Sequence, residues 1–87
     1  MRMNLIFYHR PYCHLCEEMD RALRALAAEL DLVITPIDIE SDPKLEERYG
    51  IRIPVLVCDD SELCHYHIDE AAIRQFVATK RATRSTR

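Results

Sequence analysis

The chain has 87 residues, 48% hydrophobic and 31% charged, which is typical of one globular domain and excludes a disordered chain. The net charge of −3 is uneven, because residues 80–87 hold four basic groups and no acid, which leaves −7 on residues 1–79 (eight basic against fifteen acidic groups). An acidic body argues against nucleic acid as a partner, and no stretch reaches the length of a membrane span.

The first predicted elements are a buried strand over residues 3–8 and an amphipathic helix. Apolar residues recur in steps of three and four from Cys16 to Leu30, which indicates one buried helix face. Pro11 in the intervening loop blocks an earlier helix start. A second cysteine, Cys13, therefore stands with Cys16 at the beginning of this helix.

A second strand is predicted over residues 32–39, and Pro36 within it suggests the edge of a sheet. Asp42 and Pro43 then have the pattern of a helix cap followed by the first helical turn. The short helix is expected to end near Gly50, for which we predict the left-handed conformation of a helix C-terminus.

Two further strands, residues 55–58 and 62–66, flank a turn and form an antiparallel hairpin. Asp69 is predicted to cap the last helix. We place the domain at residues 1–79 and expect residues 80–87 to form a basic, disordered tail.

The predicted order is β-α-β-α-β-β-α, an α/β domain with a four-stranded mixed sheet flanked by helices. The first three strands are joined by helices, so we expect all three to be parallel.

The motif Cys13-His14-Leu15-Cys16 gives the clearest indication of a chemical function. Two cysteines separated by two residues can close and reopen a small disulfide ring, and the unpaired N–H groups of a helix start favour a thiolate on the first. The start of the chain has too short an apolar run for a signal peptide, so we expect a reducing cytoplasm. There, this spacing indicates a redox motif.

These features resemble the thioredoxin fold over residues 3–78, and the segment from Arg10 to Cys16 looks most like a glutaredoxin or the small glutaredoxin-like proteins of bacteria. The resemblance implies that Pro54, after Ile53, is a cis proline that faces the active-site sulfur and presents backbone to the substrate. Arg10 and Tyr12 match the family's basic and aromatic residues before the first cysteine, and Asp69 matches the polar end of its glutathione site.

The chain departs from the glutaredoxin pattern at three positions. Tyr66 and His67 stand where the family usually has a pair of glycines that let the glutathione backbone approach, and His14 replaces the usual proline. Whether glutathione can enter the groove is therefore left open.

We interpret the protein as a dithiol–disulfide oxidoreductase of the cytoplasm, monomeric and without a tightly bound cofactor. Cys13 attacks a disulfide, Cys16 resolves the mixed disulfide, and glutathione or a dithiol reductase resets the pair. Disulfide-bearing proteins and glutathione mixed disulfides are the expected substrates, without nucleic acid or membrane partners. The expected substrate contacts are Arg10, Tyr12, His14, Ile53, Pro54 and Asp69.

The alternative is a non-catalytic module that binds a metal, as zinc or an iron–sulfur cluster, or a protein partner through the two cysteines. Cys64, His65 and His67 supply further metal-binding side chains, but Cys64 is expected to point to the opposite face of its strand. We interpret Cys58 and Cys64 as core thiols, because the hairpin register keeps them from facing each other.

Overall fold

The computed structural model describes residues 2–85 and confirms the predicted order of elements. The sheet has the strand order β2-β1-β3-β4. Among the described residues, no helix is long and apolar enough to cross a bilayer. The elements are β1 (Met3–His9), α1 (His14–Leu30), β2 (Leu32–Asp38), the short 3-10 helix η1 (Ile39–Ser41), α2 (Pro43–Tyr49), β3 (Val55–Cys58), β4 (Ser61–His65) and α3 (Glu70–Ser85).

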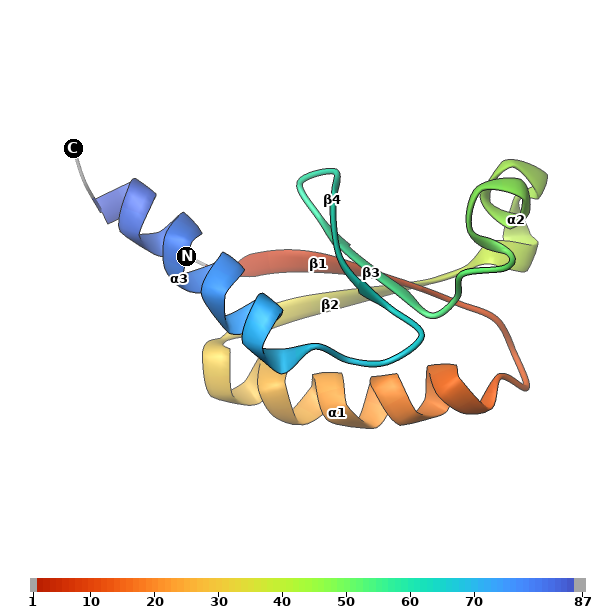
Figure 1. Cartoon of the computed structure of the whole chain (residues 1–87), viewed down its shortest axis with the longest axis horizontal. Helices are drawn as coiled ribbons and strands as arrows, with labels where there is room; N and C mark the ends of the chain where they lie inside the picture. Colours follow the sequence, from red (N-terminus) through yellow and green to blue (C-terminus); the bar gives the residue numbers. More distant parts are fainter. Residues whose placement is uncertain (1, 86–87) are drawn as a thin grey trace.

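The core lies between the sheet and the helices α1 and α3. Alternate residues of β1 are buried, because successive strand side chains point to opposite faces. Figure 1 shows α1 running along one face of the sheet. The buried side chains of this core include Leu5 and Phe7 of β1, Met19, Leu23 and Leu26 of α1, and Ile73 and Val77 of α3.

The prediction that the first three strands are all parallel is wrong for the third. β1 and β2 are parallel, but β3 pairs with β1 in the antiparallel sense, with Ile6 opposite Val57. A parallel crossover must run back the length of a seven-residue strand, roughly 23 Å. The seven residues of α2 span only about 10 Å. Figure 1 shows α2 at the end of the sheet where β1 and β2 finish, so β3 starts there and runs back.

Pro36 lies in β2, which is an edge strand of the sheet, as predicted. A proline is tolerated there because its missing N–H interrupts no second ladder.

The predicted left-handed conformation at Gly50 is wrong. Gly50 has φ −50° and ψ −39°, and its N–H donates to the carbonyl of Glu46 at 2.8 Å, so it continues the helical turn. A Cβ at this position would collide with that same carbonyl, which explains the glycine. The left-handed residue at a helix end is instead Asp31, which caps α1 with φ 56°.

The predicted disorder of the basic tail is corrected for residues 80–85, which continue α3; residues 86 and 87 lie outside the described residues. Tertiary contacts stabilise this extension. The Lys80 ammonium lies 3.1 Å from Asp59, and the Arg81 guanidinium donates to the carbonyl oxygens of Leu30 and Asp31 at the end of α1. A cation at a helix C-terminus is favourable because the carbonyl groups there lack partners.

The β3–β4 hairpin turns at Asp59 and Asp60, both with positive φ. Its register places Cys58 opposite Ser61 and Leu56 opposite Cys64, so the two cysteines do not face each other. Both are buried and remain thiols, as predicted.

Candidate redox site

Cys13 and Cys16 form the disulfide of the structure, with their Cα atoms 5.1 Å apart, a separation normal for such a bond. Cys13 is the residue that caps α1, and its sulfur accepts the backbone N–H of Cys16 at 3.1 Å. That N–H belongs to the first turn, where the helix provides no acceptor, so it is available to stabilise a thiolate. Cys13 is partly exposed whereas Cys16 is buried, which makes Cys13 the sulfur that a substrate can reach.

The Arg10 guanidinium is held by two carboxylates. It pairs with Glu46 of α2, and its Nε lies 3.8 Å from Glu40 of η1. The electrostatic effect of Arg10 on the Cys13 sulfur is therefore offset by nearby negative charge. This pairing fastens the loop before Cys13 to α2, and the sequence offered no sign of it.

His14 and Tyr12, the two neighbours of Cys13, both face solvent. The His14 side chain is 89% exposed, with its Nδ1 3.9 Å from the Glu17 carboxylate. Tyr12 is fully exposed and has a φ of 59°, the left-handed region that few bulky residues adopt. That these two residues contact the substrate remains a prediction. Because both side chains are exposed, a substrate could reach them.

The Ile53–Pro54 peptide bond is cis, as the resemblance implied, and both residues are buried. The Ile53 N–H donates to the carbonyl of Tyr49 at 3.1 Å, and the Pro54 carbonyl accepts the N–H of Tyr66 at 2.9 Å. The segment before β3 is thus bonded on one side to the end of α2 and on the other to the segment after β4.

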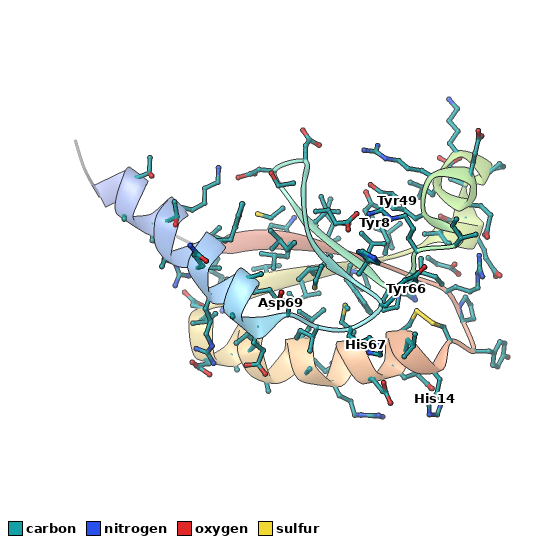
Figure 2. All side chains as sticks on the ribbon, viewed as in Figure 1. Tyr8, His14, Tyr49, Tyr66, His67 and Asp69 are labelled. Atoms are coloured by element: carbon teal, nitrogen blue, oxygen red, sulfur yellow. A yellow bond between two sulfur atoms is a disulfide. The ribbon has the colours of Figure 1, made fainter. Side chains whose placement is uncertain are left out.

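Tyr66 is a site residue whose role the sequence did not reveal. Besides its N–H bond to Pro54, its hydroxyl donates to the carbonyl of Ile51 at 2.7 Å. Tyr66 has φ 64°, a conformation that favours glycine, at the position where the resemblance expects one. Figure 2 shows Tyr66, His67 and His14 at the same end of the molecule as the disulfide.

Asp69 caps α3, as predicted, because its carboxylate accepts the N–H of Ala72 at 3.0 Å. Its expected role in substrate binding is not tested by this contact. Burial raises the pKa of the Cys64 thiol, which disfavours its thiolate form.

The residues considered as metal ligands are not gathered in space. Cys64 is buried and His65 exposed, as the strand alternation predicted. Across residues 2–85, no group of three or more His, Cys, Asp or Glu side chains is arranged to hold a metal ion.

Two cavities differ in their relation to the disulfide. The larger cavity has a volume of about 560 Å³, and none of residues 10–16 lines it. Tyr8 and Tyr49 form part of its wall, and their stacked rings have centroids 4.2 Å apart. Burial, reinforced by Tyr49, raises the pKa of Tyr8 there. The smaller, of about 100 Å³, lies between the first turns of α1 and residues 66–68. We assign the redox site to the second region, because Leu15, which stands between the two cysteines in the sequence, forms part of the wall of this cavity.

Comparison with known proteins identifies the family and the fold of this chain. Residues 4–78 match the family model described as Glutaredoxin-like domain (DUF836). A protein of Nitrosomonas europaea solved by NMR is 37% identical, with a TM-score of 0.79 over 87% of this chain and 92% of its own. A protein of X. campestris solved by X-ray is 34% identical, with a TM-score of 0.65 over 86% of this chain and 96% of its own.

A mutant thioredoxin from Halobacterium salinarum shows the shared fold, with a TM-score of 0.62 at 23% identity over 88% of this chain and 73% of its own. The architecture is therefore that of thioredoxin.

Proposed function

The chain belongs to the glutaredoxin-like domain family, and we propose that it is a thiol–disulfide oxidoreductase in which Cys13 attacks and Cys16 resolves. The observation that carries this proposal is the position of the Cys13 sulfur. It caps a helix, accepts a backbone N–H and is partly exposed, whereas its partner sulfur is buried one turn later.

In the reduced protein, the Cys13 thiolate attacks one sulfur of a substrate disulfide. A mixed disulfide forms, and the first substrate thiolate leaves. The Cys16 thiol loses its proton and attacks the Cys13 sulfur, which releases the second substrate thiolate. Two electrons pass to the substrate, which is reduced to two thiols, and the Cys13–Cys16 disulfide remains.

The N–H of Cys16 is suited to stabilise the thiolate before attack and again whenever Cys13 acts as the leaving group. His14, which is exposed beside Cys13, is proposed to donate a proton to the departing sulfur. Arg10, Tyr12, Ile53, Pro54 and Asp69 are proposed as substrate contacts.

We further propose that the protein acts in the cytoplasm as a monomer, with no tightly bound cofactor. Its proposed substrates are disulfide-bearing proteins and glutathione mixed disulfides, and glutathione or a dithiol reductase would regenerate the dithiol. These assignments rest on the resemblance to glutaredoxins and on the proposed cycle, which requires Cys13 and Cys16 to be reduced before each turnover.

Two single substitutions test the roles of the cysteines. With a disulfide substrate in excess, Cys16→Ser should accumulate a mixed disulfide on Cys13, visible as a mass adduct, whereas Cys13→Ser should accumulate none. Cys58→Ser is the matched control, because this thiol is buried away from the disulfide segment, and it should retain turnover. Full disulfide reduction by the Cys13→Ser protein would contradict the assignment.

A further inference from the structure

The smaller cavity lies between the first turns of α1, the helix that begins after Cys13, and the segment before α3. Its wall on α1 is formed by Leu15, which lies between the two cysteines, and by Glu18 and Met19 one turn later. These positions share one helix face because three and four residues complete a turn. The opposite wall consists of residues 66–68.

The volume of this cavity limits what it can bind. Its volume is about 100 Å³, whereas pockets for small ligands usually have volumes of roughly 300–1,000 Å³. A cavity of about 150 Å³ holds a benzene ring. This space therefore suits one aliphatic side chain, but not a tripeptide or a cofactor.

The lining agrees with an apolar occupant. Leu15, Met19 and Ile68 are aliphatic, and Tyr66 and His67 stand with Ile68 in the opposite wall. The hydroxyl of Tyr66 is bonded to the carbonyl of Ile51, which fixes the ring in place without a ligand. A preformed wall reduces the entropy that binding would otherwise cost.

Exposed apolar side chains also occur in the chain segments next to the disulfide and Pro54. Large hydrophobic residues with high exposure in residues 2–85 are Tyr12, Val33, Ile51 and Tyr66, and all but Val33 belong to the segments that flank the disulfide or Pro54. Ile51 is 88% exposed and Tyr66 42% exposed. Tyr66 and Ile51 are neighbours, because the Tyr66 hydroxyl donates to the Ile51 carbonyl, and exposed apolar side chains that lie together favour contact with another protein.

The charge near the cavity disfavours acidic ligands. Glu18 forms part of the cavity wall, and Glu17 is exposed in the same turn. The guanidinium of Arg10, in the loop before Cys13, is already engaged by two carboxylates. An acidic side chain of a partner would meet repulsion from Glu18 here, whereas a lysine or arginine would be attracted.

We propose that this cavity is a specificity pocket that binds an aliphatic side chain next to the cysteine of a protein substrate, with basic residues favoured beside it. The proposal rests on the oxidoreductase function proposed above and names its substrate class as protein disulfides. Tyr66 acts as the positioning residue, since it holds both the pocket wall and the segment that ends at Pro54.

The test uses peptides of equal length, each with one cysteine in a mixed disulfide with 2-mercaptoethanol. The residues on both sides of the cysteine are Leu-Lys, Leu-Glu or Gly-Gly. Kinetics of the reduced protein should give a kcat/KM for the Leu-Lys peptide about tenfold above that for Gly-Gly, as one buried aliphatic group typically provides. The Leu-Glu peptide should fall below Leu-Lys, and Glu18→Lys should invert that order.

Ile68→Trp fills the pocket and should reduce the Leu-Lys to Gly-Gly ratio at least fivefold, which is most of the discrimination of about tenfold expected from an apolar pocket. Val33→Trp, which alters an exposed hydrophobic residue of β2 instead, should leave this ratio intact. If Ile68→Trp fails to fold, Tyr66→Gly removes the opposite wall and should reduce the same ratio.

Hydroxyethyl disulfide separates the two proposals. Reaction with it, combined with equal rates for all three peptides, would overturn the pocket and retain the oxidoreductase function. Absence of reaction with hydroxyethyl disulfide and with every peptide would overturn both.

Discussion

The position of each thiol distinguishes the four cysteines. Cys13 caps α1 and is partly exposed, Cys16 is buried one turn later, and Cys58 and Cys64 lie in the core. The spacing of two cysteines alone would not separate these roles. Access to solvent and an N–H donor to the sulfur provide the physical difference.

We therefore expect reduced protein treated with iodoacetamide at pH 7 to be alkylated at Cys13 first. Burial raises the pKa of Cys64, so a smaller fraction of that thiol is ionised at neutral pH, and alkylation of Cys64 should be at least about tenfold slower. Peptide mapping by mass spectrometry at timed intervals measures both rates. Equal labelling of Cys13 and Cys64 would contradict this description of the site.

Gly50 offers a second prediction at the scale of one residue. Its φ of −50° suits alanine, and a glycine-to-alanine change at such an angle ordinarily stabilises a protein by about 0.4–1 kcal/mol. Here the added Cβ would collide with the Glu46 carbonyl, so we expect Gly50→Ala to lower the free energy of unfolding by about 1–3 kcal/mol. Urea denaturation measures the change, and a more stable variant would contradict it.

The turn between β3 and β4 carries a prediction of the opposite sign. Asp60 has φ 64°, and a two-residue hairpin turn of this kind favours Asp-Gly. Asp60→Gly should raise the free energy of unfolding by about 0.5 kcal/mol, whereas Asp60→Ala should lower it, because alanine is strained at this angle. If both variants unfold at the same urea concentration, backbone strain is not the cause.

At the scale of elements, α1 and α3 are joined by the ion pair of Glu29 and Arg74, with one N–O distance of 2.9 Å. The hydrogen bond from Arg74 lowers the pKa of Glu29 below its ordinary value of 4.5. A carboxylate with a lowered folded pKa contributes stability above its unfolded pKa, and this stability is lost as the pH falls. The pair is exposed, so its effect should be small and sensitive to salt.

Thermal unfolding of Glu29→Gln beside the unchanged protein tests this link. The variant should melt at a lower temperature at pH 7 and low salt, and the difference should disappear at pH 3 or in 1 M salt. Glu47→Gln, a change in an exposed glutamate of α2, is the matched control. A difference that persists at pH 3 would mean that the carboxylate charge is not responsible.

The end of α3 also stabilises α1. Arg81 donates to the carbonyl oxygens of Leu30 and Asp31, which the helix leaves without N–H partners. We expect Arg81→Ala to lower the free energy of unfolding by about 1 kcal/mol. Arg24→Ala, which removes an exposed arginine paired within α1, should cost less, and an equal loss in both would contradict a specific role for Arg81.

At the scale of the whole molecule, features that depend on neighbouring residues could be predicted from the sequence, whereas features that depend on contacts between distant residues could not. The cysteine pair at a helix start, the cap at Asp42 and the proline on an edge strand follow from neighbouring residues. The direction of β3 depends on the distance that α2 spans compared with the length of the strands, and the sequence pattern alone does not give this comparison.

The remaining differences arise from contacts between distant parts of the chain. Residues 80–85 are helical because Lys80 and Arg81 reach the hairpin turn and the end of α1. Arg10 is held by a carboxylate 36 positions later, and Tyr66 bonds to the carbonyl of Ile51, 15 positions earlier. None of these pairings has a local sequence signal.

Reversible oxidation of Cys13 and Cys16 is the central claim for the molecule as a whole. Intact-mass spectrometry of protein equilibrated across a glutathione redox series and trapped with acid measures it most directly. We predict a reversible loss of two hydrogens assigned to Cys13–Cys16, with a midpoint between about −270 and −120 mV, the range of catalytic relatives. Cysteines that stay reduced and unmodified across the whole series would contradict the proposed oxidoreductase.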